Sequence, residues 1–218
     1  INAEYGEHLN LTFTKKLILV NNGVPIDFSK IRVQSLTHLE ISDNSILNLN
    51  YNRKLSIGEF INCDVQISGK IAGEILVFHR CRFNEGQCSI EGRELKITKC
   101  EISHVFCKNL NLQHCLRLNL SDNKLEFLNF LKTTENIKHF DVSMNNISLS
   151  ACFYALKQNK GIQSIEYYDN PCQHEIILNE LVVSLIKGKI KSQKSKITDK
   201  IQQREKSIKS NRQVIHQN

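Results

Sequence analysis

The chain has 218 residues, 40% of them hydrophobic, which is enough for one sizeable domain whose core needs no disulfide or metal to fold. Its net charge of +7 is uneven: ten Lys and Arg residues against two acidic ones after position 186 carry +8, which leaves the first 186 residues at −1. No apolar run approaches the ~20 residues of a membrane-spanning helix, so a transmembrane segment is not expected. Because the chain begins with Ile1 rather than Met, we expect its natural N-terminus to lie upstream, and a removed signal peptide stays open.

Residues 1–13 precede the first repeated pattern and are predicted to form an N-terminal flank or cap. From residue 14 onward one pattern recurs, with apolar residues at offsets 1, 4, 6 and 11 and Asn or Cys at offset 9. Its clearest copy is CLRLNLSDNKL, residues 115–125. The copies begin at residues 14, 36, 55, 73, 92, 115, 137 and 162, at steps of 22, 19, 18, 19, 23, 22 and 25 residues. Eight copies in series, with the Asn or Cys in register, indicate a repeat protein.

This pattern resembles the LxxLxLxx(N/C)xL motif of the leucine-rich repeat family over residues 14–172. The resemblance implies a curved α/β solenoid of about eight repeats, of the intracellular type, with a parallel β-sheet on its concave face. The residue chemistry agrees, because offsets 4 and 6 share one face of a short strand and would both point into the core. An Asn at offset 9 can bond backbone groups where the chain turns after the strand. Stacked units would bury each other's apolar faces.

The middle of the solenoid departs from the family pattern. Its steps of 18–19 residues are shorter than usual, and glycine replaces leucine at positions 58, 73 and 92. We expect these short middle repeats to be nearly all-β, with extended or turn-like convex segments, and a plain β-solenoid is the open alternative there. Helix is predicted in the longer segments LEFLNFLKTTEN (residues 125–136) and SLSACFYALKQNK (residues 148–160).

Three of the eight cysteines, Cys63, Cys81 and Cys100, fall at offset 9 and would be neighbours along the solenoid. A column of thiols could suggest a metal site, but no CxxC pair or nearby histidine supplies tetrahedral spacing. We therefore interpret them as buried substitutes for the repeated Asn. The flanking cysteine clusters of extracellular family members are missing, so the resemblance implies reduced thiols in the cytosol or nucleus.

The sequence gives no support for catalysis. None of the eight histidines lies in an HExxH motif, and the chain contains no GxSxG, P-loop or GxGxxG motif. Cys107 paired with His104 or His114 would lack an orienting third group. We expect no enzymatic activity, no cofactor, no metal and no small-molecule substrate.

If the strands line the concave surface, offsets 2, 3, 5, 7 and 8 face solvent there, on the surface that solenoids use for binding. An apolar strip is expected to comprise Ile57, Ile61, Ile75 and Val77, beside a basic cluster of His79, Arg80, Arg93, Lys96 and Lys99. An acidic end follows with Asp122, Asp141, Glu166 and Asp169, beside an exposed Tyr168, and the outward side chains of the clearest unit add Arg117 and Asn119. Exposed apolar residues beside charge are typical of a protein-docking surface, and an ordinary solvated strand face is the alternative.

The segment YYDNPC, residues 167–172, is similar to the close of a terminal repeat in the family. An apolar helical pattern follows it, so residues 173–187 are predicted to form a capping helix. Residues 188–218 are predicted to form a basic amphipathic helical tail. Its isoleucine stripe includes Ile190, Ile197, Ile201 and Ile208, and its cations include Lys194, Lys196, Lys200 and Arg204. The tail would anchor the chain on a partner helix or on an acidic surface such as RNA, a tubulin-like lattice or a membrane, and a partly disordered tail is the alternative.

These features favour a non-catalytic scaffold or adaptor, a subunit of a larger ciliary, cytoskeletal or regulatory assembly. It would dock other proteins on the concave face and through the tail. The expected compartment is the cytoplasm, including a cytoskeletal or ciliary location, with the nucleus still open. One alternative is an RNA-associated component of a ribonucleoprotein, with the tail and the Arg80–Lys99 cluster on phosphate. The other is a secreted receptor or effector ectodomain, which would need a signal peptide and disulfides.

Overall fold

The computed structural model describes residues 9–10, 12–20, 25–28, 31–32, 34–43, 47–49, 53–67, 69–84, 88–103, 105–134, 136–159 and 161–171. The chain divides into two compact units, residues 1–175 and 176–218, and every described residue belongs to the first. The predicted capping helix and the predicted basic tail, with its isoleucine stripe and its cations, lie outside the described residues.

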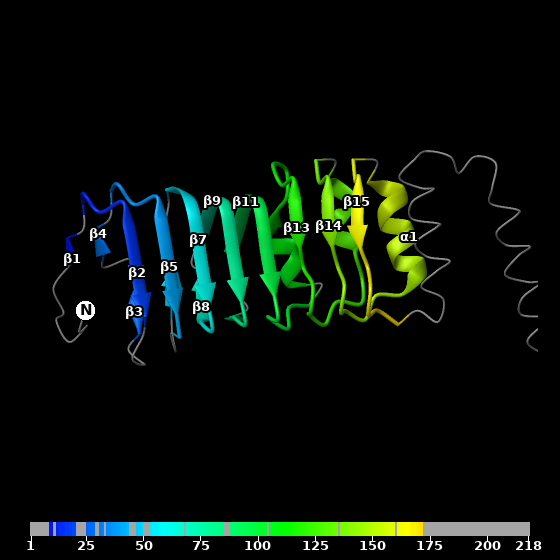
Figure 1. Ribbon diagram of the computed structural model, residues 1–218, viewed down its shortest axis with the longest axis horizontal. Coiled ribbons are helices and arrows are strands. Elements are labelled where there is room, and N and C mark those ends of the chain that lie inside the picture. Colours follow the sequence, from blue (N-terminus) through cyan, green and yellow to red (C-terminus); the bar gives the residue numbers. More distant parts are fainter. Residues whose placement is uncertain are drawn as a thin grey trace, which may run out of the picture. The chain divides into compact units, whose positions relative to one another are not determined.

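The described residues form a parallel β-solenoid with few helices. Its main sheet has nine strands, in the spatial order β15-β14-β13-β11-β9-β7-β5-β2, with β12 paired to β11 (Figure 1). These strands are β2 (Lys16–Val20), β5 (His38–Ser42), β7 (Lys54–Ile61), β9 (Gly69–His79), β11 (Cys88–Thr98), β12 (Leu110–Asn111), β13 (Arg117–Asn119), β14 (His139–Asp141) and β15 (Ser164–Glu166). The strand-rich part makes about five turns, and the three-residue strands β13, β14 and β15 continue its sheet.

Extended segments also form the opposite side of the coils. A second parallel sheet has the order β10-β8-β6-β3, and β1 pairs with β4 in a separate two-stranded sheet. The bounds are β1 (Leu9–Asn10), β3 (Ile26–Asp27), β4 (Ile31–Arg32), β6 (Leu47–Leu49), β8 (Asp64–Ile67) and β10 (Arg82–Phe83). The prediction that the middle units are nearly all-β is confirmed by β8 and β10.

The described helices are the short 3₁₀ helices η2 (Phe106–Asn109) and η3 (Asn129–Thr133) and the α-helix α1 (Leu149–Gln158). Helix was predicted over residues 148–160, and α1 confirms it; Ser148 caps α1 by accepting from the Ala151 amide (3.3 Å). Among the described residues of segment 125–136, the only helix is the five-residue η3. Its Thr134 side chain donates to the Leu131 carbonyl (3.0 Å), a local bond that competes with a continuing helix.

The predicted register is confirmed by the strand pairing. Residues at offset 4 lie side by side across the main sheet, in the order Leu17, Leu39, Gly58, Leu76, Leu95, Leu118, Phe140 and Ile165. Most of these side chains are buried, and Leu39, Leu76 and Leu95 are at most 1% exposed. Each coil therefore fills the core at the same height as its neighbours. The repeat count of eight and the family assignment stay predictions.

The predicted polar ladder at offset 9 is confirmed as well. The buried Asn123 side chain donates to the carbonyls of Ile97 (2.8 Å) and Leu120 (2.9 Å), and it accepts from the Cys100 amide (3.0 Å). The three cysteines occupy equivalent positions: Cys81 donates its thiol hydrogen to the Phe60 carbonyl (3.2 Å), and the Cys81 amide donates to the sulfur of Cys100 (3.3 Å). The thiols thus satisfy some of the backbone groups that asparagine satisfies in later coils.

Gly58 stands where most units have a large apolar residue, and the structure explains the exchange. A Cβ atom at this position would lie 2.8 Å from Leu76 Cδ2 and 3.1 Å from Leu55 Cδ1. Leu76 of the next coil is fully buried and already fills this space. A larger residue here would therefore have to displace the side chains of Leu76 and Leu55.

Restoring the repeat pattern with Gly58→Leu is therefore expected to destabilise the protein, by about 1–3 kcal/mol from overpacking. The measurement is the urea midpoint followed by circular dichroism, which suits a chain without tryptophan. Ser56→Leu, at an exposed position of the same strand, serves as the control and should change stability by less than about 0.5 kcal/mol. A rise in the midpoint of Gly58→Leu would contradict this account.

Candidate protein-binding face

The main sheet presents one face to the core and the other outward. In β5, for example, Leu39 and Ile41 are fully buried, while His38, Glu40 and Ser42 between them are half-buried. We call the side chains that alternate with the core residues, together with the turn residues that directly follow the strands, the outer sheet face. All fourteen residues predicted for partner binding are half-buried or exposed, as an accessible face requires.

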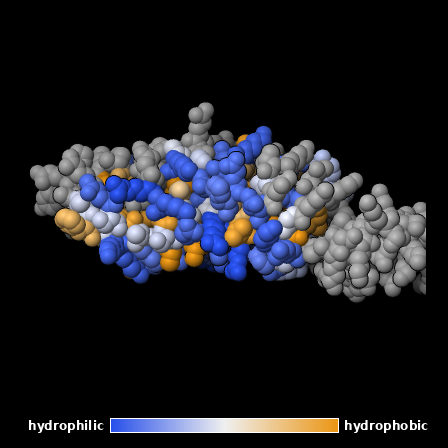
Figure 2. Space-filling model, turned by 90° about the horizontal axis from the view of Figure 1, so that it is seen from above, coloured by the Kyte–Doolittle hydropathy of each residue, from blue (hydrophilic) through white to orange (hydrophobic). Residues whose placement is uncertain are grey.

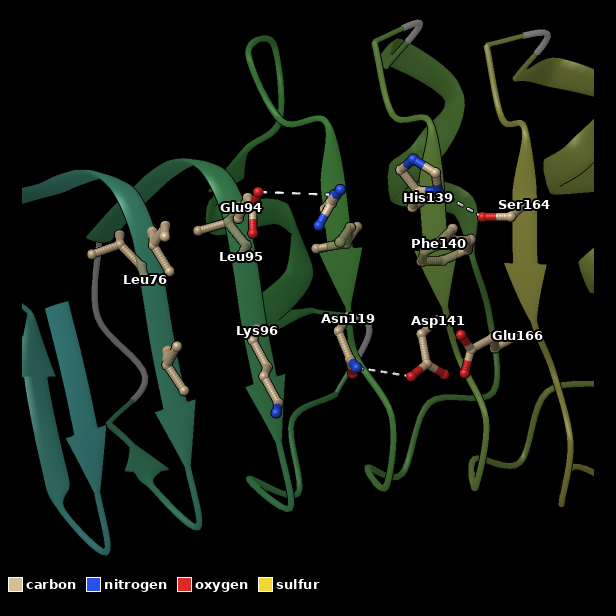
Figure 3. Close-up of a pocket in the computed structure, with 14 residues that line it drawn as sticks. Leu76, Glu94, Leu95, Lys96, Asn119, His139, Phe140, Asp141, Ser164 and Glu166 are labelled. Carbon is tan, nitrogen blue, oxygen red and sulfur yellow. Dashed lines mark hydrogen bonds and ion pairs between the residues drawn. The ribbon is translucent and has the colours of Figure 1, made fainter. Parts of the chain in front are cut away.

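The outer sheet face is hollowed between β9 and β15, with a volume of about 390 Å³ (Figure 3). Lys96, Asn119, Asp141 and Glu166 follow one another across neighbouring strands of this hollow, and Glu94 and Arg117 lie nearer the strand starts. The predicted binding residues Ile75 and Val77 also line it. Glu94 and His139 line it too and were missed from the sequence, although both occupy the outward offset 3.

Four of the five residues of the predicted basic cluster lie together. Burial lowers the pKa of His79, and the positive charges of Arg80, Lys99 and Lys96 lower it further. His79 is hydrogen-bonded to Thr98 through Nδ1 (2.8 Å). We call His79, Arg80, Lys96 and Lys99 the cationic spot.

Arg93 does not belong to this group. It lines a different hollow, at the end where the main-sheet strands begin, together with Lys54 and Glu74. Lys54 is ion-paired to Glu74 and lowers the pKa of that carboxyl, with a smaller contribution from Arg93. Figure 2 looks onto this end, where hydrophilic side chains predominate among the described residues. Arg93 therefore lies apart from Arg80 and Lys99, because offsets 2 and 8 stand roughly 20 Å apart along a strand.

The predicted apolar strip directly adjoins the cationic spot. Ile57 pairs with Ile75 across β7 and β9, Ile61 pairs with His79, and Val77 pairs with Lys96. All four aliphatic side chains of the strip are half-buried. Their uncovered portions form apolar surface next to positive charge.

The acidic end is partly engaged within the protein. Asp141 accepts from Asn119 Nδ2 (2.8 Å) and from the Ser143 amide (3.0 Å), and Asp122 lies 3.6 Å from Lys99 Nζ. Arg117 is 3.8 Å from Glu94 in an exposed ion pair. Tyr168 is 52% exposed, as predicted for this end. Asp141 and Asn119 are thus held in fixed positions by internal hydrogen bonds.

A row of left-handed turn residues follows the strands and was not anticipated. The residues at offset 8 have φ between 52° and 57°: Asp43, Asn62, Arg80, Lys99, Asp122, Met144 and Asp169. Each of these amides except that of Asp169 donates to a carbonyl of the next coil, as Arg80 does to Thr98 (3.0 Å). Asp or Asn at four of the seven positions was the available signal, since these residues tolerate this conformation best. The turns fix Arg80 and Lys99 at the edge of the sheet.

Six cysteines of the described chain are buried free thiols: Cys63, Cys81, Cys100, Cys107, Cys115 and Cys152. Burial raises the pKa of the Cys107 and Cys115 thiols to about 12, so both remain protonated and weakly nucleophilic at neutral pH. Within the described ranges, no group of three or more His, Cys, Asp or Glu side chains is placed to hold a metal ion. Over the same part of the chain, no helix has the length and apolarity needed to cross a membrane.

Comparison with models of known protein families gives no match. Searches of curated proteins and of solved structures likewise return no significant match. The geometry of the face therefore carries the functional argument.

Proposed function

We propose that this chain is a leucine-rich repeat protein of eight units that acts as a non-catalytic scaffold within a larger assembly and binds other proteins on its outer sheet face. The family part of the proposal is supported by the register at offset 4, by the Asn and Cys ladder at offset 9 and by the left-handed turns at offset 8. A turn that recurs in the seven described units from Asp43 to Asp169, with a ladder residue after it, leaves the intervening outward residues free to vary, which suits a binding scaffold.

The observation that carries the binding role is the hollowed outer sheet face with its apolar strip beside the cationic spot. Half-buried aliphatic side chains next to charge supply both contact area and orientation to a protein partner. The proposal also includes a capping helix over residues 173–187 and a basic tail that anchors the chain. It places the scaffold in the cytoplasm.

Site-specific photo-crosslinking tests this role. Benzoylphenylalanine replaces Tyr168 on the outer sheet face, and in a matched variant it replaces Tyr154, an exposed tyrosine of α1. In extract of the native cells, we expect discrete protein adducts from position 168 that excess unlabelled chain abolishes, and at least ten-fold less adduct from position 154. Equal labelling at both positions, or no competable adduct at position 168, would contradict the proposal.

A further inference from the structure

The cations of the described residues are unequally neutralised. Lys54, Lys70 and Lys124 each have a carboxylate partner on a neighbouring coil, within 3.0 Å for the last two. Within the described part of the chain, Arg80 and Lys96 take part in no ion pair, although both are exposed. Lys99 has only the long contact to Asp122. Arg80 and Lys96 therefore leave positive charge in the cationic spot that no ion pair within the described residues neutralises.

Carboxylates surround the spot and limit the size of an anion that fits it. Glu59 lies on β7 beside Val77, which itself pairs with Lys96, so Glu59 stands two strands away, roughly 10 Å. On the other side Asp141 also stands two strands from Lys96, beyond Asn119. Glu94 precedes Lys96 by two residues on the same face of β11. One or two anionic groups fit among these charges, whereas a longer run of negative charge would meet repulsion on three sides.

The apolar side chains beside the cationic spot indicate which chemical group of a partner would bind next to its anionic group. Ile61 lies beside His79 and Val77 beside Lys96, each in direct cross-strand register. A partner that places a carboxylate on the cations and an aliphatic or aromatic side chain one strand away would cover these two half-buried side chains. Such a pattern of neighbouring acidic and apolar side chains is readily supplied by a peptide segment.

The geometry points to a short acidic–apolar segment of a protein partner as the occupant of this spot, with its Asp or Glu carboxylates on Arg80 and Lys96 and an apolar side chain over Ile61 and Val77. This inference rests on the proposed scaffold function and specifies its partner chemistry. A nucleic acid fits less well, because its evenly spaced phosphates would run into Glu59, Glu94 or Asp141. The spot also contains no Phe, Tyr or Trp for base stacking: its members are His79, two lysines and an arginine, with aliphatic neighbours.

Equivalent positions in other coils suggest test substitutions that should preserve the fold. Asn62 occupies the left-handed turn position equivalent to Arg80, and Asn119 occupies the strand position equivalent to Lys96. The double variant Arg80→Asn with Lys96→Asn therefore removes two charges and installs residues that the same fold accepts at these positions. Lys108→Asn, in the exposed part of η2, serves as the control for lost positive charge elsewhere. Circular dichroism melting checks that each variant is folded.

The experiment selects ligands for the 218-residue chain from a phage-displayed library of random 12-residue peptides. Binding of the recovered peptides and of a 20-nucleotide oligouridylate is then measured by fluorescence anisotropy. We expect enrichment of peptides in which Asp or Glu lies next to Leu, Ile, Val or Phe, and at least ten-fold weaker binding of these peptides to the double variant. Binding to Lys108→Asn should stay within two-fold of the unaltered chain.

Recovered peptides without acidic residues, or binding that the double variant retains, would overturn the inference. If Lys108→Asn lost as much peptide affinity as the double variant, the attraction would come from net charge alone, and the inference would be overturned. It would also be overturned if oligouridylate bound as tightly as the peptides and displaced them. The proposed scaffold function fails separately, because position 168 can crosslink a protein partner whatever chemistry the cationic spot prefers.

Discussion

Replacing Phe78 by alanine is expected to lower the free energy of unfolding by about 3–5 kcal/mol, the range found when a buried aromatic side chain is truncated. Phe78 is completely buried in the central coil. Its ring stacks on Phe60 of the preceding coil, with centroids 4.8 Å apart, and meets Phe83 edge-on at 5.2 Å. The truncation therefore removes apolar contacts on two sides and opens a cavity that the neighbouring strands of a sheet cannot easily close.

Urea unfolding followed by circular dichroism measures this loss, and hydrogen exchange locates it. Because each coil contacts mainly its neighbours, we expect exchange protection to fall most in β7, β9 and β11. Phe13→Ala is the matched control, since that side chain is 90% exposed and its removal should cost less than about 0.5 kcal/mol. A loss below about 1 kcal/mol in Phe78→Ala would mean that Phe60 and Phe83 repack into the space.

The core could be predicted from the sequence because equivalent positions of successive repeats pack in the same way. Leu76 and Phe78 are buried for the same reason as Leu118 and Leu120, so eight weak patterns support one another. The second sheet was predicted only as extended or turn-like convex segments. Its strands β8 and β10 are four and two residues long and carry no pattern of their own.

The binding face was less predictable, because its properties depend on side-chain geometry. The offsets grouped Arg93 with His79, Arg80, Lys96 and Lys99 because they give a position but no distance along a strand; in the structure Arg93 lines a different hollow. Nor could the sequence show that Asp141 is held by Asn119 and Ser143 while Arg80 has no ion pair among the described residues. Such internal pairing decides which charged side chains remain available to a partner.

Asn145→Ala is expected to destabilise the protein by about 3 kcal/mol, because each buried backbone group left without a partner costs about 1–3 kcal/mol. The Asn145 side chain is only 4% exposed. Its Nδ2 donates to the carbonyls of Leu120 (2.9 Å), Val142 (3.1 Å) and Ser143 (3.0 Å), and its Oδ1 accepts from the Leu125 amide (3.0 Å). This one side chain therefore ties the turn after β14 to the preceding coil, and alanine can replace none of its bonds.

The chain supplies two informative companions for this substitution. Asn146 is the next residue and is exposed, so Asn146→Ala should change stability by less than about 0.5 kcal/mol. Asn145→Cys imitates the earlier coils, where the Cys100 thiol donates to the Phe78 carbonyl (3.5 Å) and its sulfur accepts from the Cys81 amide (3.3 Å). Because sulfur forms weaker and fewer hydrogen bonds than an amide, we expect the cysteine variant to fall between asparagine and alanine in its urea midpoint. If cysteine proved no better than alanine at position 145, the thiols of Cys63, Cys81 and Cys100 would be filling space rather than satisfying the backbone.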